Sequence, residues 1–421
     1  MSFLSKFLVC LVFVALFVAP FEFLPAVGPV FAQTPSPSAN TVTVTPAVTP
    51  AATPTVTPAT PSAPAAVAAS APRGANWWTD AARILAGLEP TGGSGLAAVA
   101  ARAPTVQHRR AFAVAWQSFE AARLEPAMRF AAKELVPLSA AGGPVFYPFS
   151  GPDAMYALGM FPGANAFALI GLEPVGELPD MAALDDANLG ASLAELRRSL
   201  NSIKAFSFFR TNDMRAEFGR NRFSGVTPIL LLFVARHGFS VHAVEPVLMQ
   251  ANGTLAEVSV NVIRNLGPER VPGVRIRFQK PGDTTECTLY YFSADLSDQG
   301  LEKVPAPLKW AEGFAPRTTY IKSASYLMHK TYFSRVRDFI LAKSALVVQD
   351  DSGIPLRLYR DIVWERTLFG KYDGPIQLFA NWYQKDLRAA YLKQAQPLEF
   401  GIGYDFQAKT SNIQRFVRRA E

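Results

Sequence analysis

Cysteine is almost absent from this sequence. Only Cys10 and Cys287 occur among the 421 residues, and Cys10 lies in an apolar run near the N-terminus. If that run is removed, as we expect below, the single remaining cysteine cannot form an intrachain disulfide. A small disulfide-rich fold is therefore excluded, and the folded part of the chain depends on its apolar core.

The motifs of several common catalytic and binding classes are also missing. The sequence contains neither a G-x-x-x-x-G-K-[ST] phosphate loop nor an H-E-x-x-H zinc-binding helix. Its four histidines show no close metal-ligand spacing, and no G-x-S-x-G motif marks a hydrolase nucleophile. No basic and aromatic nucleic-acid-binding module is present either. We therefore expect no metal site and no nucleic-acid partner.

The first 32 residues are typical of a signal peptide. Lys6 precedes an apolar run from Phe7 to Ala19, and Val30-Phe31-Ala32 ends in the small residue that signal peptidase requires. The run is short for a membrane span. An uncleaved anchor is the alternative. We expect a secreted or periplasmic protein that begins at Gln33 and meets the membrane only through this segment during export.

Charge is missing from the segment that follows. Residues 33–72 consist almost entirely of Pro, Thr, Ala, Val and Ser, with no charged side chain. Such a composition cannot bury a core, and its prolines favour extended polyproline II. We predict a disordered linker over residues 33–75, which serves either as a stalk or as a passive connection.

Residues 144–174 show the clearest pattern of a folded domain. Val145 to Tyr147 is a short apolar stretch that predicts a strand, and Ser150-Gly151-Pro152-Asp153 predicts a turn before a helix that ends near Met160. Ala166 to Ile170 is apolar throughout, which is typical of a strand buried on both faces in a parallel sheet. The stretch therefore predicts a βαβ unit.

Helical and strand patterns alternate along the later chain. Leucines spaced over residues 189–200 predict a crossover helix, and strict alternation over 274–278 and 287–291 predicts an antiparallel hairpin. Further strands are expected over 319–327, 345–348 and 398–404, followed by a frayed basic end that contains Arg415, Arg418 and Arg419. We predict a helical region over 76–136 and an α/β domain over 137–421. This domain is expected to be Rossmann-like, with a mostly parallel sheet, helices on both faces and an antiparallel hairpin insertion.

Polar side chains follow three of the predicted strands. They are Ser150, Gly151 and Asp153 after the first strand, Glu173 after the second, and Asp350 with Asp351 after the strand at 345–348. Ligands of open α/β sheets bind at the carboxyl ends of the strands, so these loops form our candidate ligand site. Ordinary turns use the same residue types and are the alternative. Convergence of the carboxylates would favour a divalent cation or a polyhydroxylated ligand over an anion.

The segment over residues 145–173 resembles the first βαβ unit of class I S-adenosylmethionine-dependent methyltransferases. In that family the turn after the first strand meets the cofactor, and an acid after the second strand binds its ribose. Ser150, Gly151, Asp153 and Glu173 stand at the matching positions, whereas the glycine-rich G-x-G pattern of the family is absent. The resemblance implies a Rossmann-like fold and makes S-adenosylmethionine the alternative to having no cofactor.

These sequence features allow three candidate functions to be placed in order. The signal peptide and the lack of a complete catalytic set favour an exported envelope or extracellular protein that binds an unknown small molecule or envelope component. A methyltransferase-like enzyme that uses the three loops is the first alternative. A hydrolase centred on Ser150, with His329 and Asp350 as its partners, is the second.

Overall fold

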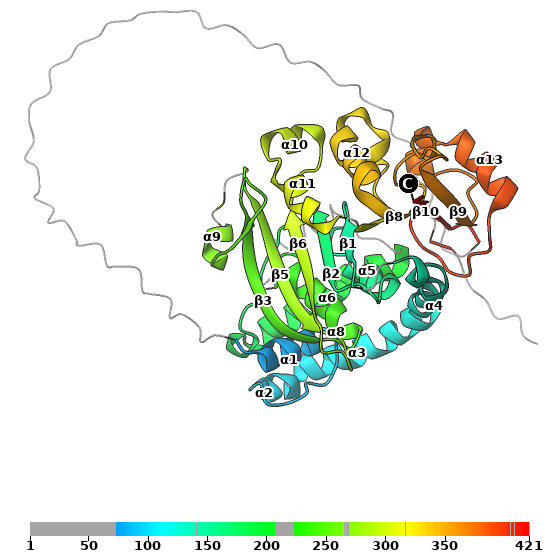
Figure 1. Ribbon diagram of the computed structural model, residues 1–421. Coiled ribbons are helices and arrows are strands. Elements are labelled where there is room, and N and C mark those ends of the chain that lie inside the picture. The colour runs from blue at the N-terminus through cyan, green and yellow to red at the C-terminus, as the bar shows by residue number, and fades with distance from the viewer. Residues whose placement is uncertain are drawn as a thin grey trace, which may run out of the picture. The chain divides into compact units, whose positions relative to one another are not determined.

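A single mixed sheet organises the chain (Figure 1). In this computed structural model the described residues are 73–420, apart from 140–141, 207–222, 265, 267–268, 316, 405 and 408. The expected signal peptide and residues 33–72 of the expected linker lie outside them. The strand order is β4-β3-β5-β6-β2-β1-β7-β8-β10-β9. The strands are β1 (Pro144–Tyr147), β2 (Ala166–Gly171), β3 (Ser240–Met249), β4 (Leu255–Glu257), β5 (Val271–Gln279), β6 (Glu286–Ser293), β7 (Arg317–Ile321), β8 (Ser344–Gln349), β9 (Trp364–Gly370) and β10 (Asn412–Arg418).

The centre of the sheet is parallel. Strands β6, β2, β1, β7 and β8 run in one direction, and Val145 of β1 is registered with Phe167 of β2 and with Thr318 of β7. The predicted βαβ unit is confirmed, because α5 (Ala154–Met160) connects β1 to its parallel neighbour β2. Both strands are buried along almost their whole length, as their lack of polar residues predicted.

The expectation of a mostly parallel sheet is wrong. Of the nine neighbouring strand pairs, four are parallel and five are antiparallel. The α/β class is confirmed, and so is the hairpin of β5 and β6. However, β3, β4 and β5 extend one edge of the sheet, while β10 and β9 extend the other. The short connections between β3 and β4 and between β5 and β6 account for the antiparallel pairing at the first edge, whereas β9 and β10 are antiparallel although a long segment that contains α13 joins them.

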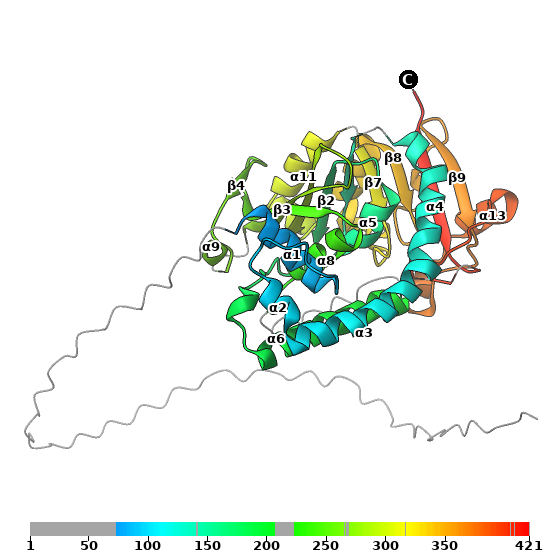
Figure 2. The ribbon, with the colours of Figure 1, turned by 90° about the horizontal axis from the view of Figure 1, so that it is seen from below.

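Helices cover both faces of the sheet, and Figures 1 and 2 show α1, α3, α6 and α8 together on one side. The helices on this side share one apolar core with the sheet face that they cover. They are α1 (Ala75–Leu85), α3 (Ala103–Phe119), α4 (Glu125–Glu134), α5, α6 (Asp186–Phe206) and α8 (Thr227–Arg236). A second core lies under the helices of the opposite face: α10 (Asp298–Lys303), α11 (Ala306–Ala311), α12 (Ser334–Lys343) and α13 (Lys385–Gln394). The short helices α2 (Ala97–Ala101) and α9 (Val260–Arg264) complete the described set. No helix among the described residues is long and apolar enough to cross a membrane.

The C-terminal end corrects another expectation. Residues 398–404 contain no strand, and the segment expected to fray is β10, which lies between β8 and β9. Ile413 and Phe416 are buried in the two cores. The arginines made the segment look like a solvated tail, but each has a partner in the fold: Arg415 bonds to the Glu134 carboxylate at 2.8 Å, and Arg418 bonds to the Ser344 carbonyl.

Candidate ligand pocket at the carboxyl ends of the parallel strands

A cavity of about 500 Å³ opens where the parallel strands end. Its walls come from the residues that follow β1, β2, β6 and β7, and from two later segments near Phe379 and Tyr404. Four of the six sequence-predicted site residues line it: Ser150, Gly151, Asp153 and Glu173. The volume falls in the range of small-molecule sites, and its position is the usual one in an open α/β sheet.

Glycine allows the first two loops to approach each other closely. A Cβ atom on Gly171 would lie 2.9 Å from the Gly151 Cα atom and 2.4 Å from Glu173 Oε2. Gly151 also has a φ of 52°, a left-handed conformation that costs most other residues energy. Because neither position has a side chain, the loops after β1 and β2 can lie in contact, and the Glu173 carboxylate lies next to Gly151.

Glu173 presents a buried carboxylate to the cavity. Its Oε2 atom accepts a hydrogen bond from the Leu172 amide at 3.1 Å and lies 3.1 Å from the Tyr291 hydroxyl. Burial, with Glu173 as a second cause, raises the pKa of Tyr291, so that phenol stays protonated and can donate. Among the described residues, no hydrogen bond reaches the second oxygen, Oε1. Although the residue is only 3% exposed, Oε1 is not among the buried side-chain atoms that lack a partner, so it is accessible from the cavity that Glu173 lines.

Asp153 and Lys322 form a buried ion pair in the cavity wall. Lys322 Nζ lies 2.7 Å from Asp153 Oδ2, and the Tyr147 hydroxyl donates to the same oxygen at 2.8 Å. Lys322 Nζ also lies 4.1 Å from the centre of the Tyr156 ring. Burial raises the pKa of Asp153 and lowers the pKa of Lys322, while their attraction opposes both shifts. The lysine therefore already has a counter-charge and is not free to bind an anion.

Sequence reasoning missed Lys322. The strand expected over residues 319–327 ends in the structure at Ile321, so Lys322 is the first residue of a loop at the carboxyl edge. The rule that selected the other site residues would have selected it too, had the end of the strand been recognised.

The loop after β7 has an unusual backbone. Ser323, Ser325 and Tyr326 have φ values of 53°, 51° and 52°, in the left-handed region that side chains disfavour. The Tyr404 hydroxyl accepts a hydrogen bond from the Ser325 amide at 3.0 Å, and Asp350 Oδ2 accepts one from the Ser323 amide at 2.8 Å. Such conformations cost about 1–3 kcal/mol each and gather at functional sites. Both serines line the cavity.

Asp350 and Asp351 take a different place from the other predicted site residues. Neither lines the cavity, and both are buried behind the β7 loop. Asp351 accepts hydrogen bonds from Tyr326 and from Asn412, the latter at 3.0 Å. Burial, followed by the charge of Asp350, raises the pKa of Asp351 to about 7. These two carboxylates support the loop that forms the cavity wall.

Ser150 and His329 do not form a hydrogen-bonded triad with Asp350 in the described residues. The Ser150 hydroxyl lies 2.9 Å from the Gly151 carbonyl and 3.3 Å from the Ile170 carbonyl, so it donates to backbone. His329 borders a separate depression beside Trp382, and burial lowers its pKa to about 4. A nucleophile needs a base within hydrogen-bonding reach, and Ser150 has none among these contacts.

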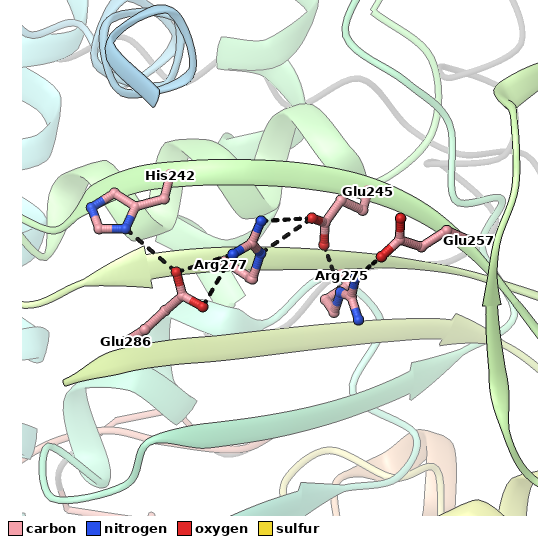
Figure 3. Close-up of polar contacts among 6 residues, drawn as sticks. All are labelled: His242, Glu245, Glu257, Arg275, Arg277 and Glu286. Carbon is pink, nitrogen blue, oxygen red and sulfur yellow. Dashed lines mark hydrogen bonds and ion pairs between the residues drawn. The ribbon is translucent and has the colours of Figure 1, made fainter. Parts of the chain in front are cut away.

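Two arginines on the β5 strand of the hairpin, Arg275 and Arg277, are paired with carboxylates (Figure 3). Glu245 accepts hydrogen bonds from Arg275 at 2.6 Å and from Arg277 at 2.9 Å. Arg275 also contacts Glu257, and Arg277 lies 3.4 Å from Glu286. Each guanidinium thus already has carboxylate partners, so this surface is an ionic ladder across β3 to β6 rather than an anion site.

Within the described part of the chain, no group of three or more histidine, cysteine, aspartate or glutamate side chains is placed to hold a metal ion. No protein-family model, curated protein or solved structure matches this chain.

Proposed function

We propose that this chain is an exported protein whose α/β domain binds a hydroxyl-bearing small molecule in the cavity at the carboxyl ends of β1, β2 and β7. The observation that carries the proposal is the Glu173 carboxylate. Glu173 lines the cavity; its Oε2 atom accepts a hydrogen bond from the Leu172 amide and lies 3.1 Å from the Tyr291 hydroxyl, and no hydrogen bond among the described residues reaches Oε1.

A carboxylate oxygen that opens onto a cavity can accept a hydrogen bond from a ligand hydroxyl, and hydrogen bonds to charged groups contribute about 1.5–3 kcal/mol. Hydroxyl groups supply such donors without the cost of burying a second charge. An anionic group would meet Glu173 directly, and the cation in the wall, Lys322, is already paired with Asp153. The site therefore favours hydroxyl-bearing ligands over anions.

A methyltransferase-like enzyme is the second candidate, and the strand order favours it. Five parallel strands run in the order β6-β2-β1-β7-β8, and this part resembles the doubly wound sheet expected of the class I methyltransferase family, whereas the antiparallel strands β3, β4 and β5 depart from it. Glu173 follows the second strand, as the ribose-binding acid does in that family. The chain departs from the family in its turn after β1, which lacks the G-x-G pattern. An S-adenosylmethionine ribose would supply the hydroxyl donors that Glu173 can accept.

Calorimetric titration of the mature chain separates these candidates. Methyl β-glucoside represents a simple polyol, and S-adenosylhomocysteine represents the adenosyl cofactor. Loss of a hydrogen bond to a charged group costs about 1.5–3 kcal/mol, so Glu173→Gln should weaken binding about 10- to 150-fold. The control is Glu365→Gln, which changes an exposed glutamate on β9 and should leave affinity unchanged.

The outcomes are distinct. Binding of S-adenosylhomocysteine alone would favour the enzyme, and binding of the glucoside alone would favour a polyol-binding protein. If a ligand binds the cavity but Glu173→Gln leaves its affinity within twofold, the proposed role of Glu173 is wrong. Mass spectrometry of the protein purified under mild conditions provides an independent test, because a ligand that co-purifies reports its own mass.

A further inference from the structure

Part of the cavity wall is apolar, and the binding of a hydroxyl-bearing group at Glu173 gives this part no role. Phe149, Phe333 and Phe379 form part of its wall, together with Leu172 and Leu378. Phe149 and Phe333 meet edge to face, with ring centres 5.7 Å apart, and Phe379 packs against Tyr404 at 5.0 Å. These contacts hold the rings in place, so the apolar wall is already formed.

The wall continues onto the surface at the mouth of the cavity. Leu378 is 79% exposed and Leu172 is 53% exposed, although both line the cavity. Tyr332 is 53% exposed and packs beside Phe333. Single exposed apolar residues need no explanation, but a group of them around one opening is typical of a binding surface.

We infer that the ligand is an amphiphile. Its hydroxyl-bearing head occupies the floor beside Glu173, and an aliphatic or aromatic arm of the same molecule leaves the cavity across Leu172 and Leu378. The inference rests on the proposed function for the head, while the apolar wall alone carries the arm. The continuity of the wall with the polar floor identifies the occupant, since one molecule can cover both surfaces.

The arm can be tested with N-phenyl-1-naphthylamine, a neutral apolar dye that becomes fluorescent when it leaves water. Leu378→Ser removes an exposed apolar side chain from the mouth and should raise the dye dissociation constant about five- to tenfold. The matched control is Leu392→Ser, since Leu392 on α13 is 73% exposed and does not line the cavity. Glu173→Gln should change dye binding less than twofold, because the dye has no hydroxyl group.

A link between head and arm is tested by displacement of the dye. Below its micellar concentration, n-octyl β-glucoside should displace the dye at a concentration at least tenfold lower than methyl β-glucoside does, because its chain covers the wall. In Leu378→Ser this advantage of the longer chain should shrink several-fold.

Three results would overturn the inference. The first is equal weakening of the dye by Leu378→Ser and Leu392→Ser, and the second is equal displacement by the two glucosides. The third is a dimer, detected by light scattering, that Leu378→Ser dissociates, because a second copy of the chain would then cover the wall. Failure of the proposed function is separate: there, Glu173→Gln leaves glucoside and S-adenosylhomocysteine affinity intact while the dye results stand.

Discussion

Replacing Lys322 by methionine should destabilise the fold strongly and in a pH-dependent way. Methionine fills much of the volume of the lysine stem but removes the ammonium that lies 2.7 Å from Asp153 Oδ2. Asp153 would remain buried, at 2% exposure, with the neutral Tyr147 hydroxyl and the Tyr156 backbone amide as its donors and no cation beside it. Removing one partner of a buried pair costs about 3–5 kcal/mol, which is a large part of the stability of an ordinary domain.

The pH dependence has a definite sign. Burial already raises the folded-state pKa of Asp153, and losing Lys322 removes the largest influence that lowers it. A carboxyl group with a raised folded pKa stabilises the fold below its unfolded pKa, and this contribution is lost as pH rises through the folded pKa. In the natural chain the attraction of Lys322 opposes the rise in the pKa of Asp153, so the same loss of stability with pH is smaller. The difference between the two proteins should therefore grow from about pH 5 to pH 8.

Urea unfolding followed by tryptophan fluorescence measures this difference. The midpoint of Lys322→Met should fall well below that of the natural chain at pH 8 and approach it at pH 5. The double variant Lys322→Met/Asp153→Leu leaves no unpaired charge and should recover much of the loss. A loss below about 1 kcal/mol at pH 8, or one that does not vary with pH, would refute the argument that the pair is buried and charged.

Three further predictions concern other parts of the fold. Asp351→Asn should lower stability at pH 5 by about 1 kcal/mol through a weakened hydrogen bond. The difference should shrink by pH 8, since the ionised Asp351, whose pKa is about 7, loses stability as pH rises; a constant difference across a urea series would contradict this. Gly171→Ala should weaken ligand binding in calorimetry by displacing Glu173, because its Cβ would lie 2.4 Å from Oε2. Glu245→Gln should cost about 0.5–1.5 kcal/mol at low salt and less in 1 M NaCl, whereas a salt-independent loss would exclude an electrostatic role for the ladder.

Processing of the N-terminus stays a prediction as well. The exported protein should begin at Gln33, and N-terminal sequencing of secreted material checks this directly. Membrane-bound protein that retains Met1 would instead favour the uncleaved anchor.

The sequence alone determined most local elements and identified four residues that line the cavity: Ser150, Gly151, Asp153 and Glu173. The continuous apolar run at 166–170 predicted a buried parallel strand, because it is short and follows the helix-breaking pair Pro162-Gly163. The turn residues after β1 and β2 were identified because a ligand site in an open α/β sheet forms where the strands end. The helical leucine stripe and the alternating hairpin could be recognised for the same reason, since periodicity is a local property.

Only the tertiary structure decided which strands are neighbours. Pairing joins residues far apart in the chain, and the antiparallel strands at both edges cannot be read from local periodicity. The Asp153–Lys322 pair links loops after β1 and β7, so neither residue reveals its partner in the sequence. Asp350 and Asp351 follow a strand as Asp153 does, yet the loop after β7 covers them. Their carboxylates accept hydrogen bonds from that loop instead of lining the cavity. Burial and pairing depend on what the rest of the fold places over each side chain, and no local pattern contains that information.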